Sequence, residues 1–275
     1  MIRAVLASTL VLTLSGPAAA QGAATGERIP SHCIALAEAP AIWLHRASFG
    51  QPLAEGRVRI SFLHHAMFLI EAPGGLSAVT DYTGFLGATD HVPDVVTMNN
   101  AHGTHWTDRP DPRIPHVLPG WEGFGGTVEH ELDLGGMLVR NVQTDVRGWQ
   151  GGVRPNGNSI FVFETAGLCI GHLGHLHHEP SPEQYAMLGR LDVVMAPVDG
   201  GYTLDLPTMM RVVSRLRSSV VLPMHWFSGR SLEVFLAGMA QEFEVVRPGG
   251  NFIELSLYGL PARPTIVVLE PRLLD

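Results

Sequence analysis

Residues 62 to 75 read FLHHAMFLIEAPGG, and this stretch decides the fold class. Two short apolar runs, at 58–63 and 67–72, flank the pair His64-His65, and Pro73-Gly74-Gly75 closes the second run. Runs of this length, rich in branched and aromatic residues and bounded by turn residues, are typical of β-strands. The stretch therefore predicts two β-strands with a pair of histidines between them.

The rest of the chain continues with strands and adds helices only late. Further strands are predicted at 78–80, 95–98, 137–142, 159–164, 168–171, 193–196, 220–223, 245–246, 252–257 and 266–269, with a turn at 155–158. A capping-box pattern at Ser181 starts one helix, and apolar stripes predict helices at 209–217 and 231–243. This order predicts an α/β (α+β) fold in which two layers of sheet are flanked by helices.

Composition and charge narrow the function classes. The chain has 275 residues, of which 45% are hydrophobic and 16% charged, which suits one or two globular domains. The formal net charge is -8, and no basic run appears. Nucleic acids and anionic membrane surfaces require clustered Lys and Arg, so neither is an expected partner. A small-molecule substrate is expected, and the oligomeric state stays open.

The N-terminus has the pattern of a secretory signal peptide. One Arg precedes an apolar stretch at 4–14, and the small residues 18–20 follow Gly16-Pro17. The apolar stretch is shorter than the roughly 20 residues that a membrane span needs. We expect a signal peptide at 1–20, a lead-in at 21–55 and one domain at 56–275, in a secreted or periplasmic protein without a membrane span after cleavage.

Export would permit a disulfide between the two cysteines, Cys33 and Cys169. The alternative is that Cys169, which lies in an apolar strand, is simply a small buried side chain. Neither cysteine is expected to be catalytic.

Histidines follow four of the predicted strands, and the chain holds 14 of them in all. The clusters are His64 and His65, then His102 and His105, then His172, His175, His177 and His178, and finally His225. Loops that leave the ends of neighbouring strands converge on one rim, where ligands and metals gather. Neutral imidazole is a common metal ligand, so the pattern predicts a metal site there.

Several segments, in their order along the chain, resemble motifs of the metallo-β-lactamase superfamily. FLHHAMFLIEAPGG is similar to its opening hairpin, Asp81 stands at a T-D-P turn, and PDVVTM (93–98) resembles the strand before the metal loop. Three later family motifs have counterparts in this chain. The motif A-G-D-T-G corresponds to IGHLGH (170–175), P-I-G-G-G-Y-T-M to APVDGGYTL (196–204), and I-P-M-H-Y to LPMHW (222–226). The resemblance covers about 58–228 and points to the branch of ascorbate-phosphate lactonases and N-acylphosphatidylethanolamine phospholipase D. It implies a four-layer αββα sandwich.

The resemblance also implies a metal site that departs from the family pattern. The family's H-x-H-x-D-H falls on residues 100–105, where Asn100 replaces the first His and Thr104 the Asp. The middle His is missing from TDVRGW (144–149), and the bridging Asp corresponds to His172. A two-metal site is therefore not expected. The remaining ligands imply one metal held by His102, His105, His172 and His225, with Zn first and Fe or Cu as alternatives.

Other candidates lie on segments that reach the site in the family. Asn100 is expected to orient water or ligate weakly, Asp199 to support a histidine or act as a turn residue, and Tyr202 to contact substrate. These three are the catalytic candidates. The substrate-binding candidates are His65, Arg147, whose planar fork matches anionic groups, and His175.

The primary hypothesis is a metal-dependent hydrolase of an ester, lactone, amide or phosphodiester, with a metal-activated water as nucleophile. Two alternatives remain, because a fold does not fix a function. One is a non-catalytic descendant that binds a metal or ligand, and the other is a mononuclear Fe or Cu redox enzyme.

Overall fold

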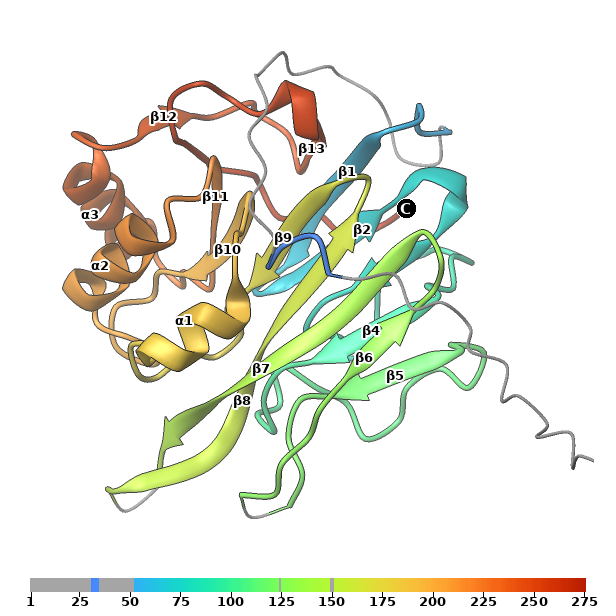
Figure 1. The fold of residues 1–275 in the computed structure, drawn as a ribbon, viewed down its shortest axis with the longest axis horizontal. Helices are drawn as coiled ribbons and strands as arrows, with labels where there is room; N and C mark the ends of the chain where they lie inside the picture. Colours follow the sequence, from blue (N-terminus) through green and yellow to red (C-terminus); the bar gives the residue numbers. More distant parts are fainter. Residues whose placement is uncertain (1–30, 35–51, 124, 149–150) are drawn as a thin grey trace, which may run out of the picture.

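A computed structural model of the protein describes residues 31–34, 52–123, 125–148 and 151–275 (Figure 1). The expected signal peptide at 1–20 and most of the lead-in at 21–55 lie outside these residues, so their boundaries stay predictions. Among the described residues there is no helix with the length and apolarity to cross a membrane.

The predicted hairpin lies inside a six-stranded sheet. β1 (Arg57–His64) pairs antiparallel with β2 (Met67–Glu71), with Ile60 opposite Ile70, as the alternation predicts. The sheet order is β13-β1-β2-β3-β4-β5, in which β3 to β5 run parallel. Its other strands are β3 (Ser77–Val79), β4 (Val95–Met98), β5 (His116–Pro119) and β13 (Phe252–Ser256).

A second, eight-stranded sheet faces the first, in the order β12-β14-β11-β10-β9-β8-β7-β6. Its half from β12 to β9 is parallel and its half from β9 to β6 is antiparallel. The strands are β6 (Glu131–Asp133), β7 (Met137–Arg147), β8 (Val153–Thr165), β9 (Leu168–His172), β10 (Val193–Pro197), β11 (Val220–Met224), β12 (Glu244–Val246) and β14 (Thr265–Val267).

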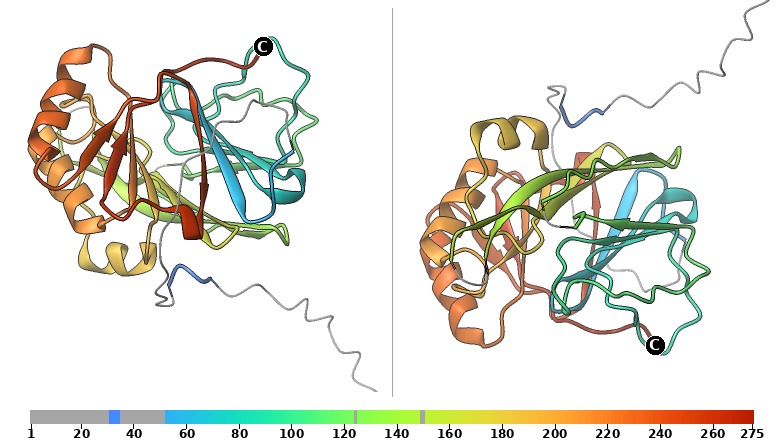
Figure 2. Two further views of the ribbon diagram at one scale, coloured as in Figure 1. Left: turned by 90° about the horizontal axis from the view of Figure 1, so that it is seen from above. Right: turned by 90° about the horizontal axis from the view of Figure 1, so that it is seen from below.

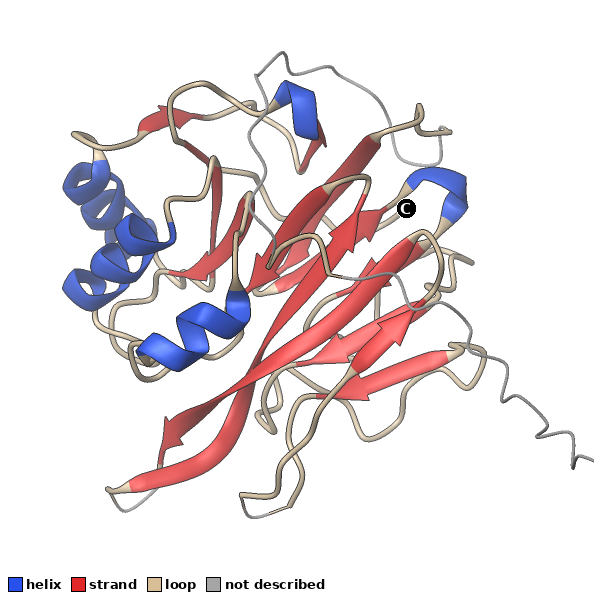
Figure 3. Cartoon of the chain, in the orientation of Figure 1, coloured by secondary structure: helices blue, strands red, loops and turns tan. Residues whose placement is uncertain are grey.

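Two apolar cores hold three layers together. The inner faces of the sheets pack through side chains such as Phe68, Phe161 and Ile170, all fully buried. The outer face of the eight-stranded sheet packs against α1 (Pro182–Leu188), α2 (Leu206–Leu216) and α3 (Gly229–Met239) (Figures 2 and 3). Each large side chain buried in this way contributes about 1.5–3 kcal/mol.

The outer face of the six-stranded sheet differs from the expected fourth layer. Loop residues cover it, including Tyr82, Leu86 and Ile114, and no helix of the described chain contributes to this packing. Prolines at 93, 110, 112, 115 and 119 explain the difference, because proline lacks the N–H that a helix interior needs. The predicted α/β class and the sandwich of two facing sheets are confirmed, and at this face loops take the place of a helical layer.

The turn predicted at 155–158 is wrong. Residues 155–158 lie within the long β8, where Asn156 adopts a positive φ of 53° and the pairing with β7 is irregular between Thr144 and Val146. A β-bulge absorbs the residues that predicted a turn. The backbone N–H of Asn156 donates to Oδ1 of Asp145 across the two strands, which keeps them together.

Cys33 and Cys169 form a disulfide, with their Cα atoms 5.8 Å apart. Of the two alternatives, pairing is the one that the structure bears out. The bridge fixes residues 31–34 against β9, and the neighbouring Ser31 hydroxyl and His32 N–H both donate to the Glu164 carboxylate. The closed loop is long, with a sequence separation of 136, so its constraint on the unfolded chain is worth up to about 5 kcal/mol.

Candidate metal centre

Loops that follow strands of both sheets meet at one rim and bring imidazoles and carboxylates together. Among the described residues, two groups of three histidines have ring nitrogens within 4.8 Å of one another, and they share His105. The first group is His65, His105 and His225, and the second is His102, His105 and His175.

His105 and His225 face each other through their Nε2 atoms, which lie 3.1 Å apart. Behind each ring stands a carboxylate, because Nδ1 of His105 lies 2.6 Å from Oδ2 of Asp81 and Nδ1 of His225 lies 2.9 Å from Oδ2 of Asp199. A proton on Nδ1 that is shared with a carboxylate leaves the Nε2 lone pair free for a metal. Two imidazoles on one tetrahedral zinc stand roughly 3.3 Å apart, so this pair has ligand spacing.

His65 completes the first group. Its Nε2 is buried and has no hydrogen-bond partner among the described residues, which is costly unless the nitrogen binds something. Burial, followed by the neighbouring His225 and His105, lowers the pKa of His65 to about 3, so the ring is neutral. A neutral, unpartnered imidazole next to the facing pair fits a third ligand.

The backbone holds these rings in a strained arrangement. His65 and His225 have φ angles of 49° and 62°, a region that residues other than glycine seldom adopt. The N–H of His225 donates to the carbonyl of His65 at 2.9 Å, which ties the two loops together. Strain of this kind persists where the surroundings fix it, commonly at functional sites.

The two carboxylates have different environments. Asp81 is fully buried, and burial raises its pKa to about 6 although Oδ1 also accepts the N–H of Asn99. Oδ1 of Asp199 accepts the backbone N–H groups of residues 201–203. Burial alone would raise the pKa of Asp199, but its bonds with His225 and Thr203 outweigh this and hold it below the usual value. Asp199 thus has the contacts of both roles expected for it, because it faces His225 and also bonds the turn at 201–203.

In the second group, His175 is buried and His102 is exposed. Nδ1 of His102 lies 3.0 Å from the Thr104 hydroxyl, and its ring stacks on His175 with centroids 5.4 Å apart. The structure thus brings together three of the four predicted ligands, His102, His105 and His225. His175, predicted to bind substrate, lies within the same cluster.

His172, the fourth predicted ligand, lies behind the cluster, where its Nε2 is 4.0 Å from Oδ2 of Asp81. Its Nδ1 faces the N–H of Gly174 and the side-chain amide of Asn99, both at 3.1 Å, and its Nε2 lies 2.7 Å from the carbonyl of Ala66. Both ring nitrogens are therefore engaged inside the protein. The residue of IGHLGH that reaches the site is His175, three positions later, because β9 ends at His172 and the loop turns at Gly174.

The other predicted residues have mainly supporting contacts. Asn100 donates its amide to the carbonyl of Gly157 at 2.7 Å. Nη2 of Arg147 donates to the three carbonyls of residues 201–203, so this guanidinium holds the Asp199 loop. Tyr202 is 69% exposed, and its ring lies 5.3 Å from that of Phe227.

Sequence reasoning missed three residues here. Asp81 was noticed only as part of a turn motif, although its place directly after a buried strand is the position of a supporting carboxylate. Phe227 is 65% exposed and lies 5.3 Å from the rings of both His65 and His225, and its place two residues after His225 was the available signal. His177, whose Nε2 lies 2.7 Å from Nδ1 of His175, belongs to one of the predicted histidine clusters but is not among the predicted site residues.

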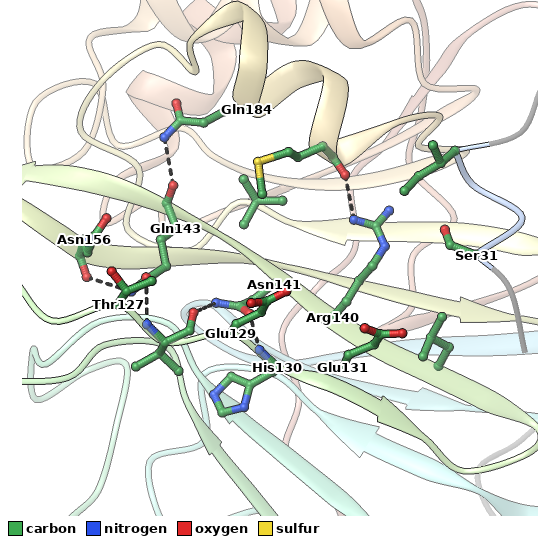
Figure 4. Close-up of a pocket in the computed structure, with 15 residues that line it drawn as sticks. Ser31, Thr127, Glu129, His130, Glu131, Arg140, Asn141, Gln143, Asn156 and Gln184 are labelled. Carbon is green, nitrogen blue, oxygen red and sulfur yellow. Dashed lines mark hydrogen bonds between the residues drawn. The ribbon is translucent and has the colours of Figure 1, made fainter. Parts of the chain in front are cut away.

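A cavity of about 580 Å³ lies apart from this cluster, beside β7 and α1 (Figure 4). Its polar side chains bond within the protein: Arg140 donates to Glu164 and to two carbonyls of α1, and Gln184 donates to the carbonyl of Gln143. None of the clustered histidines lines it. This cavity is therefore separate from the candidate metal centre.

Known proteins resemble this chain over most of its length. A UPF0173 metal-dependent hydrolase of Thermoplasma volcanium is 25% identical over 191 residues, 62% of this chain and 83% of the relative. The corresponding protein of Anaeromyxobacter dehalogenans is 26% identical over 71% of this chain and 86% of its own. A metallo-beta-lactamase superfamily structure from Thermotoga maritima matches with a TM-score of 0.56 and 26% identity, over 78% of this chain and 99% of the other.

These matches confirm the expected superfamily and fold class, and the relatives carry the predicted class, metal-dependent hydrolase. The specific branch stays a prediction. The profile of the family described as "Beta-lactamase superfamily domain" matches residues 59–225, more than half of the chain. The chain belongs to this family.

Proposed function

We propose that the protein is an exported hydrolase with one divalent metal, held by His65, His105 and His225. The observation that carries the proposal is the 3.1 Å approach of two Nε2 atoms whose opposite nitrogens each face a carboxylate. Three imidazoles suit zinc, with iron or copper as alternatives. A bound metal would act as a Lewis acid and lower the pKa of a coordinated water.

The chain's own residues orient the site and shape its mouth. Asp81 and Asp199 keep the protons of His105 and His225 on Nδ1, which leaves each Nε2 free to ligate. The bonds from residues 201–203 and from Arg147 fix Asp199 in turn. Preorganised groups of this kind need no rearrangement during the reaction.

The surroundings favour a carbonyl substrate with an apolar portion over a phosphodiester. The guanidinium that was expected to bind an anion, that of Arg147, is already engaged with backbone carbonyls. Two exposed aromatic rings, Tyr202 and Phe227, lie beside the cluster instead. Exposed aromatic side chains next to a site offer an apolar surface for a substrate, so an ester or lactone is the favoured class and an amide the next.

The test is turnover against metal content. The protein, stripped with chelator and reloaded with zinc, iron or copper, is assayed with p-nitrophenyl butyrate, a γ-lactone, an anilide and bis-p-nitrophenyl phosphate. We expect turnover of the ester or lactone that saturates near one metal per chain and disappears in His225→Ala. His64→Ala removes an exposed neighbouring imidazole and serves as the control.

Two results would redirect the proposal. A folded protein that binds one metal but turns over none of these substrates supports the binding-protein alternative. An iron or copper protein with redox activity and no hydrolysis supports the redox alternative. Phe227→Ala should raise KM more for p-nitrophenyl butyrate than for p-nitrophenyl acetate, which has the shorter acyl chain. Equal effects on the two KM values would contradict the proposed apolar contact.

The proposed export is supported by the N-terminal pattern and by the disulfide, because disulfides persist in oxidising compartments. Expression with residues 1–20 in a Gram-negative host should yield a processed periplasmic protein with no free thiol. A cytoplasmic, unprocessed and reduced product would contradict it.

A further inference from the structure

A chain of hydrogen bonds leads from the backbone into the histidine cluster. The backbone N–H of Arg147 donates to Nδ1 of His177 at 2.8 Å. Nε2 of His177 lies 2.7 Å from Nδ1 of His175. Neither contact has a role in the proposed metal site, yet together they decide where the protons of both rings lie.

The proton positions follow from one fact, which is that a backbone N–H can only donate. Nδ1 of His177 must therefore accept, so the proton of this neutral ring is on Nε2. That proton is donated to His175, whose Nδ1 must also accept. The proton of neutral His175 is then on Nε2, the opposite of the form that ligates a metal through Nε2.

The surroundings place this N–H at the site. The His175 ring packs edge-on against His105 and His225, with centroids 4.7 and 5.2 Å apart. Its Nε2 has no hydrogen-bond partner among the described residues, and this nitrogen is accessible to solvent.

The backbone before His175 leaves no freedom to reorient. The His175 N–H donates to Oδ1 of Asn158 at 2.8 Å. Gly174 has a φ of 62°, and a Cβ there would lie 2.5 Å from side-chain atoms of Asn158 and Asn99. The loop is therefore fixed where the ring leaves it, and His175 is presented in one orientation.

We infer that His175 is a hydrogen-bond donor to a substrate oxygen and not a metal ligand, and that His177 is the positioning residue that fixes its tautomer. The inference rests on the proposed function for the substrate, but the tautomer stands independently of it. An N–H aimed at a carbonyl oxygen stabilises the negative charge that develops when the carbonyl is attacked. This donor lies three residues after His172, the position where the family resemblance implies a bridging carboxylate.

The direct test is the ¹⁵N–¹H correlation spectrum of the histidine rings, recorded on protein without metal and on protein loaded with ¹¹³Cd. We expect His175 to show a protonated Nε2 and an unprotonated Nδ1 in both states, with cadmium coupling at His65, His105 and His225 only. A protonated Nδ1 on His175, or cadmium coupling to its Nε2, would overturn the inference.

Variants separate the tautomer from mere packing. In His177→Phe, His175 should lose its fixed tautomer, whereas in the control His178→Ala the spectrum of His175 should be unchanged. An unaltered His175 tautomer in His177→Phe would count against the positioning role. His177→Gln, which keeps an amide donor, should retain more of the wild-type tautomer than the Phe variant.

Kinetics test the donor role. His175→Leu should lower kcat by about 10²–10³-fold with one metal per chain retained, and His175→Gln, which keeps an N–H donor, should recover part of the loss. Loss of the metal in His175→Leu would assign His175 as a ligand instead. If the wild type hydrolyses none of the substrates, the proposed function fails, while the ring spectra still decide the tautomer.

Discussion

Two places in this molecule bury histidines, and the difference between them shows which rings are available to bind a metal. Around His172, both ring nitrogens bond to the protein, through the N–H of Gly174, the amide of Asn99 and the carbonyl of Ala66. At the rim, His105 and His225 use one nitrogen on a carboxylate and direct the other toward each other. Burial is common to both places, so the partner of the second nitrogen decides the role.

The largest effect is expected from removing a ring at the rim. His225→Ala removes one of the two facing nitrogens and leaves Asp199 without its imidazole, so metal retention should be lost. Turnover should fall at least about 100-fold, since even the supporting partners of metal ligands are worth 10–100-fold. Metal content by elemental mass spectrometry and initial rates measure this. If His225→Ala retained its full metal content, the rim histidines would be no more available to a metal than His172, and the comparison would fail.

A smaller effect is expected from the carboxylates that stand behind the rings. Asp81→Asn and Asp199→Asn should each weaken metal affinity by about 10–100-fold, because the Nδ1 proton is no longer held by an anion. Competition titration against a zinc chelator measures the affinity. Asp108→Asn removes an exposed carboxylate and is the matched control. An equal loss in all three variants would indicate a general charge effect.

At His172 the comparison predicts a loss of stability with little effect on the metal. His172→Leu removes the acceptor of the buried Gly174 N–H and one hydrogen-bond partner each of the Asn99 amide and the Ala66 carbonyl, which should lower the free energy of unfolding by about 1–3 kcal/mol. Denaturant unfolding measures this, and the metal content of the folded variant should stay near wild type. If His172→Leu is stable but loses its metal, His172 is a ligand, as the sequence predicted.

The smallest effect is a pH dependence of the metal-free protein. Burial lowers the pKa of His65 to about 3 and holds that of His105 well below its usual value, whereas both rings titrate near 6.5 in the unfolded chain. Below pH 6.5 the unfolded state therefore binds more protons, so stability should fall as the pH falls from 6.5 toward 3. Thermal unfolding at several pH values measures the slope, which should be shallower in His65→Leu. An unchanged slope would contradict the neutral, buried ring.

The sequence predicted most of the fold because hydrophobic alternation is local. The hairpin around His65 and the strand 95–98 agree with the structure, whereas the bulge at Asn156 depends on pairing with β7. In the site, strand ends indicated where histidines gather. Local sequence could not show whether His172 or His175 turns outward, because that depends on which ring meets Ala66 across the two sheets.

The central claim is that one metal lies between the three rings of His65, His105 and His225. The most direct measurement is an anomalous difference map, recorded at the zinc edge, from crystals of the zinc-loaded protein. We expect a single strong peak within bonding distance of the Nε2 atoms of these three rings. A peak at His172, a second peak of equal height bonded to His175, or no peak at the rim in zinc-saturated crystals would contradict it.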